Sequence, residues 1–422
     1  MDTRPGRYRW LICGLLLAAM AINYVQRQSV GLLKGPLQHE FSLDENGYAG
    51  IVFWFQAAYA VGYVSFGRVL DRLGARAGYA IAFILWNLSH MAGGLAVNIM
   101  QFTLARIGLG LGESGAFPAS LKAVAEWFPQ RERALAAGIF NAGTNLGAII
   151  APAVVPVLTA LWGWRSSFFV TGAVGTLWII AWWACYRRPQ DHPRVDAREL
   201  ALIEADPPDP VEAVAWWRLL RLKETWAYAG ARFLIDPVWW FYLFWLPDFL
   251  YRTYHLNLSG FGPPLIAIYL ISDLGSVLGG WSSSAMLRRG VGVNVARKLT
   301  LLVCAALVLP VWLVDGAREL WMAVLLIGLA AAAHQAFSAN LYTFPSDVLP
   351  RSAVASVSGI GGMMGAVGGM LFSRFVGQVL QAGGSYRILF LIAGSVYLMA
   401  LTVIHVLSPR LRRVTGARVA LI

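Results

Sequence analysis

Charged residues and cysteine are both scarce in this chain, and each scarcity excludes classes of protein. Charged side chains make up 13% of the 422 residues, against about 25% in an average soluble domain. The three cysteines, Cys13, Cys185 and Cys304, lie in separate apolar stretches and form no CxxC pair. Soluble multidomain enzymes, disordered chains and disulfide scaffolds are therefore excluded, and neither disulfides nor a metal site is expected.

Apolar residues are abundant instead. They account for 58% of the chain, and the mean hydropathy is +0.59. A membrane-spanning helix needs about 20 mostly apolar residues, so twelve helices would use about 240, which is close to the apolar supply. Composition therefore predicts an all-α membrane protein with twelve transmembrane helices.

Apolar windows bounded by charges, glycine or proline place these helices along the chain. The predicted ranges are 10–33, 47–67, 79–98, 101–124, 134–161, 167–187, 225–250, 263–287, 297–314, 319–345, 352–380 and 386–408. Their spacing is even except at 188–224, which is polar and rich in proline. We expect an N-terminal six-helix bundle at 1–187, a linker at 188–224 and a pseudo-symmetric C-terminal six-helix bundle at 225–422.

Positive charges are distributed unevenly over the predicted loops. Of the 34 basic residues, 25 fall on the side that holds both termini and the linker, five on the opposite side and four inside spans. Cytoplasmic loops of membrane proteins are enriched in lysine and arginine. Both termini are therefore predicted to be cytoplasmic, and the net charge of +12 is explained without a nucleic-acid partner.

The loop after the second predicted helix carries a specific pattern. Residues 67–76 read GRVLDRLGAR and match G-x-x-x-D-R-x-G-x-R at Gly67, Asp71, Arg72, Gly74 and Arg76. This resembles the signature of the major facilitator superfamily, in which the glycines allow a tight turn and close helix approach. An ordinary basic loop is the alternative. The matching loop of the second half, 280–298, has no equivalent aspartate.

Further segments resemble a narrower family, the anion:cation symporters. These segments are 126–129, 131–133, 141–152, 232–237, 273–280, 334–336 and 346–348. As a set they are most similar to the bacterial hexuronate transporters. The resemblance implies import of glucuronate or galacturonate by proton symport through a bacterial inner membrane. It also implies a proton gradient in place of a cofactor, no enzymatic activity and a monomeric chain.

An ionisable residue deep in a membrane helix costs at least about 2.5–3.5 kcal/mol and is a functional candidate by default. Glu113 lies near the middle of helix 101–124, and Arg106 lies two turns earlier on the same face. A buried carboxyl group favours its protonated form, whereas a nearby cation favours its charged form. Glu113 is therefore predicted to carry the proton with Arg106 tuning it, a role that the resemblance also implies. A structural ion pair is the alternative.

Arg27 lies among apolar residues of the first predicted helix. We predict that it faces a water-filled cavity and holds the substrate carboxylate in a bidentate fork, although it could extend to the membrane surface instead. Gln26 stands where many relatives that transport aldonates or glucarate have aspartate. One protonatable group is therefore missing, which predicts one coupled proton and a monoanionic substrate.

Sugar hydroxyls need hydrogen-bonding groups, and a sugar ring needs an aromatic face. Tyr24, Tyr59 and two amides of the fifth helix, Asn141 and Asn145, are predicted to supply them. The amides share one side of their helix, and joining helices is an equal alternative for them. The GxxxG pattern at 143–147 is typical of helix packing.

The second half offers further polar candidates. Arg232, Trp240, His334 and Gln335 are predicted to bind substrate, and Asp236 and Asp273 are possible second proton sites. The i,i+4 pair Arg232–Asp236 could simply neutralise itself, and His334 could be a core histidine whose hydrogen bonds are satisfied. Pro237 is expected to interrupt its helix and form a gate.

The combined prediction is a proton-coupled importer of a monoanionic sugar acid whose two bundles rock about a midplane site. An aldonate or glucarate carrier is the main alternative, and two buried arginines would also suit organic-phosphate exchange. A membrane enzyme would need a catalytic acid or metal cluster, which the loops lack. A sensor would need a longer linker that forms a domain.

Overall fold

A computed structural model describes residues 6–205, 216–349, 351–411 and 414. Two features predicted from the sequence lie partly outside these ranges. The linker is described only up to residue 205 and again from 216. Four basic residues of the predicted cytoplasmic tails, Arg4, Arg412, Arg413 and Arg418, also fall outside the described residues.

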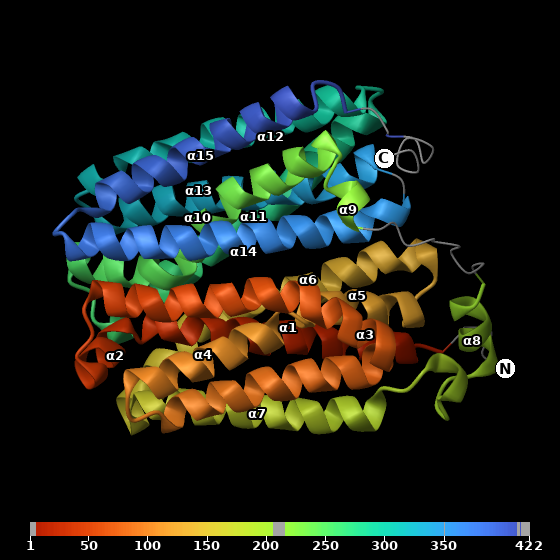
Figure 1. Cartoon of the computed structure of the whole chain (residues 1–422), viewed down its shortest axis with the longest axis horizontal. Helices are drawn as coiled ribbons and strands as arrows, with labels where there is room; N and C mark the ends of the chain where they lie inside the picture. Colours follow the sequence, from red (N-terminus) through yellow and green to blue (C-terminus); the bar gives the residue numbers. More distant parts are fainter. Residues whose placement is uncertain (1–5, 206–215, 350, 412–413, 415–422) are drawn as a thin grey trace. The chain divides into compact units, whose positions relative to one another are not determined.

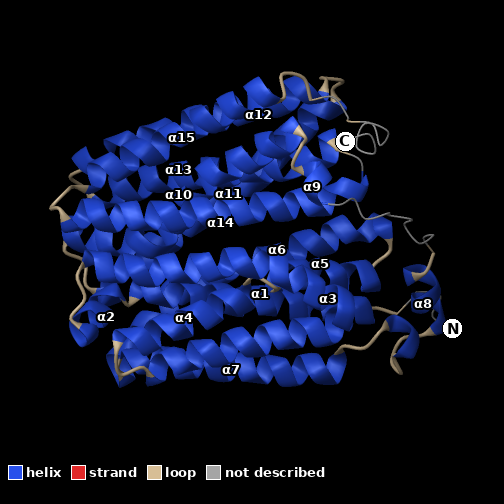
Figure 2. Ribbon diagram, in the orientation of Figure 1, coloured by secondary structure: helices blue, strands red, loops and turns tan. Residues whose placement is uncertain are grey.

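The described residues form helices and no strand (Figure 2). The first half contains α1 (Tyr8–Leu32), α2 (Lys34–Phe41), α3 (Glu45–Leu95), α4 (Ile99–Glu113), α5 (Ala116–Trp127), α6 (Gln130–Trp162) and α7 (Trp164–Cys185). The linker contributes η1 (Pro189–Asp191), α8 (Ala197–Ile203) and α9 (Trp216–Leu219). The second half contains α10 (Lys223–Tyr254), η2 (Leu258–Gly260), α11 (Gly262–Arg288), α12 (Val293–Val308), η3 (Leu309–Gly316), α13 (Leu320–Val348), α14 (Arg351–Gln381) and α15 (Tyr386–Leu407).

Helical segments correspond to all twelve predicted spans, which confirms the all-α membrane class. Within the described chain, nine helices are long and apolar enough to cross a membrane. One of them, α3, contains two predicted spans separated at Gly74, where φ is 75° and ψ is 175°. The remaining spans are the α4–α5 pair, divided at 114–115, and α10, which has four charged residues between Arg232 and Arg252.

Two details of the helix prediction were wrong. The expected loop at 68–78 is reduced to the single residue Gly74, because positive φ lets glycine turn the chain in one step. The predicted interruption at Pro237 is also absent, since α10 continues through Pro237 and Pro247. Membrane helices tolerate proline where neighbouring helices cover the disturbed backbone. Here Gly368 of α14 packs against the carbonyl oxygen of Phe233, four residues before Pro237.

The described chain divides into two compact units, residues 1–36 with 57–210 and residues 37–56 with 211–422. In the first unit, α1 packs against α6 and α7 (Figure 1). Gly143 and Gly147 of α6 face the carbonyl oxygens of Leu17 and Ala21 on α1, where a side-chain carbon would overlap them. The GxxxG pattern therefore packs these two helices together. In the second unit, α10 packs against α14 and α15, and α13 packs against α11 and α12.

Residues 188–205 of the linker belong to the first unit, whereas residues 216–224 belong to the second. Glu199 of α8 is fully buried, and its carboxylate accepts hydrogen bonds from the backbone N–H groups of Tyr8 (3.1 Å) and Arg9 (3.0 Å). The Arg9 guanidinium also binds Glu199 at 3.1 Å and Glu132 at 2.9 Å. Glu199 thus caps the first turn of α1, where unpaired N–H groups favour a negative charge.

Candidate functional site

A buried ion pair joins α1 to α4 in the first unit. Nε of Arg27 lies 2.8 Å from Oε2 of Glu113, and both side chains are almost completely buried, at 5% and 0% exposure. Glycines on α4 make this burial possible, because Gly108 and Gly112 face Ser89 and the backbone of Trp86 on α3 without room for a side chain. The predicted anchor and the predicted proton carrier are therefore direct partners.

Three more side chains surround the Arg27 guanidinium. The guanidinium carbon lies 4.7 Å from the ring centre of Tyr24 and 5.0 Å from that of Tyr59, which is the distance range of cation–π contacts. Arg27 Nη2 donates to Oδ1 of Asn23 at 3.0 Å and to the Tyr59 hydroxyl at 3.4 Å. The two predicted tyrosines thus lie at the predicted arginine, and the sequence analysis overlooked Asn23.

Arg106 takes a different position from the one its spacing suggested. Its Nη2 lies 3.5 Å from the backbone carbonyl oxygen of Arg27, and the side chain is 2% exposed. Arg106 thus reaches across from α4 to the α1 backbone, while Glu113 pairs with Arg27.

The other polar predictions in the first unit lie outside this cluster of contacts. Asn141 is exposed and Asn145 is half-buried on α6, and Oδ1 of Asn145 accepts from the Thr144 hydroxyl at 3.2 Å. Gln26 faces a different part of the bundle from Arg27, where its amide donates to Asn87 Oδ1 at 2.9 Å. Gln26 therefore fills a packing position in this structure.

The second unit contains its own arginine–carboxylate pair. Both Nε and Nη2 of Arg232 donate to Oδ2 of Asp236, at 2.7 and 2.6 Å. Arg232 also donates to the hydroxyl of Tyr228 at 3.1 Å and lies 4.7 Å from the ring centre of Tyr342. Gly365 of α14 leaves the space that the Asp236 carboxylate occupies. The pair resembles Arg27–Glu113 in composition, since two tyrosines again flank the arginine, although Arg232 is only half-buried.

His334 has hydrogen-bonding partners at both ring nitrogens. Nδ1 lies 2.6 Å from the Tyr397 hydroxyl and Nε2 lies 3.4 Å from the Ser338 hydroxyl. The ring also stacks on Trp239 at 5.3 Å with an interplanar angle of 4°. These contacts agree with the alternative interpretation, in which His334 is a core histidine whose hydrogen bonds are satisfied.

Trp240, Gln335 and Asp273 complete the predicted set in the second unit. The Trp240 ring is buried and stacks on Phe244, with ring centres 5.9 Å apart. Gln335 and Asp273 are both half-buried. No ion pair is recorded for Asp273 among the described residues, so it is not held by a cation as Asp236 is.

The residues of the 67–76 motif lie at the turn of α3. Asp71 is largely exposed and lies 3.7 Å from Nζ of Lys122, which also donates to the carbonyl oxygen of Leu70 at 2.7 Å. Arg76 Nη2 donates to the carbonyl oxygen of Trp183 at 2.9 Å. Arg72 is exposed. The motif therefore links α3 to α5 and α7 mainly through backbone carbonyl groups.

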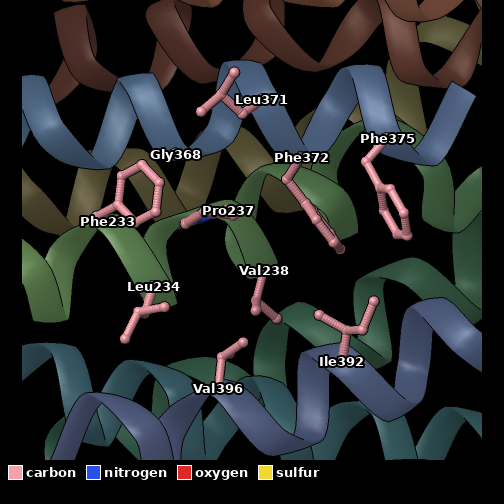
Figure 3. A pocket seen from close by; sticks show the side chains of 10 residues that line it. All are labelled: Phe233, Leu234, Pro237, Val238, Gly368, Leu371, Phe372, Phe375, Ile392 and Val396. Carbon is pink, nitrogen blue, oxygen red and sulfur yellow. The ribbon is translucent and has the colours of Figure 1, made fainter. Parts of the chain in front are cut away.

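An apolar cavity of about 260 Å³ lies among α10, α14 and α15 (Figure 3). It is lined by Phe233, Leu234, Pro237, Val238, Gly368, Leu371, Phe372, Phe375, Ile392 and Val396. None of the predicted substrate or proton residues lines it, and it lacks the polar groups that a sugar acid needs. Among the described residues, no group of three or more His, Cys, Asp or Glu is placed to hold a metal ion.

The residues that the sequence analysis missed share a simple signal. Asn23 and Tyr228 each lie four residues before an arginine of a predicted span, Arg27 and Arg232, and each hydrogen-bonds it. Side chains four residues apart meet on one helix face. Searching that spacing around each intramembrane arginine would have found both.

Comparisons with known proteins agree with this architecture. The sequence matches the Major Facilitator Superfamily over residues 11–373. It is 32% identical over 383 residues to the hexuronate transporter of Escherichia coli (strain K12), covering 89% of this chain and 88% of that protein. A probable L-galactonate transporter from the same strain is 27% identical over 402 residues, covering 94% and 88%. The fold resembles the crystal structure of a bacterial homologue of the human lysosomal transporter Spinster, with a TM-score of 0.71, 18% identity and 96% coverage of both chains.

Proposed function

Because the chain belongs to the Major Facilitator Superfamily, we propose that it is a proton-coupled symporter that imports a monoanionic sugar acid, namely an aldohexuronate such as glucuronate or galacturonate. Membership of this family makes the chain a multi-pass membrane transporter and not an enzyme. The observation that carries the proposal is the buried Arg27–Glu113 pair, which holds a carboxylate on a guanidinium inside the membrane.

Coupling follows from the cost of leaving a buried charge without a partner. Removing one member of a buried ion pair costs about 3–5 kcal/mol, so Arg27 needs an anion at all times. That anion is either the Glu113 carboxylate or the substrate carboxylate. Protonation of Glu113 neutralises it and releases the Arg27 guanidinium, which then accepts the substrate. Proton and substrate therefore bind together, as symport requires.

Recognition of the sugar is assigned to the groups around the pair. The faces of Tyr24 and Tyr59 are proposed to contact the ring, and their hydroxyls to bind substrate oxygens. The amides of Asn141 and Asn145 are further candidates on α6. Arg106, which contacts the Arg27 backbone, is proposed to hold α1 in place and to tune Glu113.

The second unit is proposed to contribute Arg232, Trp240, His334 and Gln335 to substrate binding. Asp236 is neutralised by Arg232, so it is a weaker proton candidate than Glu113. Asp273 lacks such a cation and is the first alternative acid.

The two halves of the chain and the segment between them have separate proposed roles in transport. Residues 1–187 and 225–422 are proposed to act as the two moving bundles, joined by 188–224, with the 67–76 motif controlling their movement. The basic residues counted above support cytoplasmic termini in a bacterial inner membrane. We propose a monomer as the working unit.

An aldonate or glucarate is the second candidate substrate. The 27% identity to a probable L-galactonate transporter supports it, and a guanidinium fork binds the carboxylate of either class. The amides of Asn141 and Asn145 on α6, which are exposed and half-buried, do not discriminate between a uronate and an aldonate or glucarate.

Uptake of labelled glucuronate into proteoliposomes tests the proposal. An inward proton gradient is expected to drive accumulation several-fold above the external concentration, and collapsing the gradient with a protonophore should abolish it. Unlabelled galacturonate, gluconate and glucarate serve as competitors. If only gluconate or glucarate competes with labelled glucuronate, the protein is an aldonate or glucarate transporter, which is the second candidate function. Absence of any saturable uptake would contradict sugar-acid transport.

A further inference from the structure

Asn23 lies one helical turn before Arg27 on α1 and is 1% exposed. Its Oδ1 accepts a hydrogen bond from Arg27 Nη2 at 3.0 Å. A guanidinium can only donate hydrogen bonds, so the amide oxygen must face Arg27. This fixes the orientation of the amide group and turns Nδ2, with its two N–H donors, away from the guanidinium.

Among the residues that the structure describes, Nδ2 of Asn23 has no hydrogen-bond partner. In the same part of the chain, Oε1 of Glu113, the carboxylate oxygen that accepts no hydrogen bond from Arg27, also has none. Buried polar groups in proteins are almost always paired, and an exception calls for an explanation. The two side chains that bind the Arg27 guanidinium thus carry one buried donor and one buried acceptor that have no hydrogen-bond partner among the described residues.

We propose that Asn23 determines substrate specificity by donating from Nδ2 to the oxygen next to the substrate carboxylate, while its Oδ1 positions Arg27. This inference rests on the proposed function and names the chemical feature that the site recognises. In a hexuronate, the carbon that bears the carboxylate carries the ring oxygen. In an aldonate, the same carbon carries a hydroxyl group. Asn23 therefore selects carboxylates with an oxygen on the neighbouring carbon over plain carboxylates.

The neighbouring residue Gln26 provides a matched control. It is also a buried amide on α1, but it donates to Asn87 and to the carbonyl oxygen of Thr171 and not to any group of the Arg27–Glu113 pair. Replacing either amide by leucine keeps its approximate shape. Only the change at Asn23 removes a group beside the guanidinium.

The test compares two ligands across wild type, the Asn23 variants and the Gln26→Leu control, with dissociation constants measured by calorimetry on purified protein. The ligands are glucuronate and its carbocyclic analogue, in which a methylene group replaces the ring oxygen. In wild type and Gln26→Leu, loss of the oxygen should weaken binding about five- to tenfold, as expected for one hydrogen bond. In Asn23→Leu, both ligands should bind with equal affinity. Asn23→Ser, whose side chain is too short to reach, should behave in the same way if the leucine variant does not fold.

If Asn23 only positioned Arg27, replacing Asn23 would weaken the binding of both ligands equally, and the ratio of their dissociation constants would not change. A preserved five- to tenfold ratio in Asn23→Leu and Asn23→Ser would therefore overturn the proposal, as would equal binding of the two ligands by wild type. If wild type binds no uronate, the hexuronate proposal fails, and the same cycle with gluconate and 2-deoxygluconate decides the role of Asn23.

Discussion

Arg27 Nε donates to Glu113 Oε2 over 2.8 Å, although 86 residues separate the two side chains in sequence. The residue best suited to bind a substrate carboxylate is therefore already bound to a carboxylate of the protein. In the proposed mechanism, these two carboxylates compete for one guanidinium, so a proton on Glu113 would control substrate binding without a separate coupling device.

Arg27→Ala should abolish glucuronate binding and also destabilise the protein. Removing the guanidinium leaves Glu113 as an uncompensated buried charge, at a cost of about 3–5 kcal/mol. The double variant Arg27→Ala/Glu113→Gln should recover stability but not binding. Arg27→Lys should recover little binding, because lysine lacks the planar fork. Apparent melting temperatures and dissociation constants of all three variants are the measurements. If Arg27→Ala binds glucuronate with a dissociation constant within a few-fold of the wild-type value, Arg27 does not bind the substrate carboxylate, and Arg232 becomes the candidate.

Glu113→Gln should separate binding from coupling. The amide imitates the protonated acid and frees Arg27, so the variant should bind substrate with an affinity that no longer varies with pH. It should exchange internal for external glucuronate while failing to accumulate it against a gradient. Asp273→Asn is the matched control and should accumulate substrate normally. Concentrative uptake by Glu113→Gln would move the proton to Asp273 or Asp236.

Transport should be close to electroneutral. One proton on Glu113 and one substrate carboxylate sum to zero charge, and Asp236 is already neutralised by Arg232. The membrane potential acts on net charge at about 2.3 kcal/mol per elementary charge per 100 mV. Uptake into proteoliposomes at a fixed pH gradient, with a potassium–valinomycin potential, should therefore change little. A several-fold acceleration by an inside-negative potential would require a second protonated site.

Gly147→Ala should impair the transporter, whereas Gly138→Ala on the same helix should not. A methyl group at Gly147 overlaps the carbonyl oxygen of Ala21 and crowds Tyr24, while Gly138 has open space around it. We expect α1 to shift away from α6 and weaken glucuronate binding at least about fivefold, as overpacking costs of about 1–3 kcal/mol imply. Dissociation constants and melting temperatures of the two variants provide the comparison. Equal behaviour would mean that α1 and α6 can separate without disturbing the site.

Glu199→Gln should lower the melting temperature clearly more than Glu204→Gln. Glu199 is fully buried and receives two backbone N–H groups of α1 together with the Arg9 guanidinium. Glu204 is exposed and accepts one hydrogen bond from Gln190. Loss of a helix cap costs about 0.5–2 kcal/mol, and a buried arginine left with less compensation adds to this. Similar melting temperatures would show that α8 contributes nothing to the stability of the first unit.

The sequence by itself was sufficient for the class of protein and the number of spans. A bilayer requires about 20 apolar residues in each helix, and this requirement is met locally, within each stretch of sequence. Rare intramembrane charges such as Arg27, Glu113 and Arg232 are equally visible, because each stands out from its apolar neighbours. The glycines of the 67–76 motif indicated a tight turn between two helices, but the sequence placed a loop over 68–78, whereas the structure turns the chain at Gly74 alone.

Partnership between those charges was decided by the tertiary structure. Spacing along one helix suggested that Arg106 and Glu113 belong together, yet the packed helices join Glu113 to Arg27 and send Arg106 to the α1 backbone. Proline disturbs the backbone in any helix, so the sequence predicted an interruption at Pro237. In the packed protein, Gly368 of α14 lies against this part of α10, and α10 continues through the proline. A membrane helix determines its own length and face through local composition, whereas the partner of each buried polar group depends on which other helix covers it.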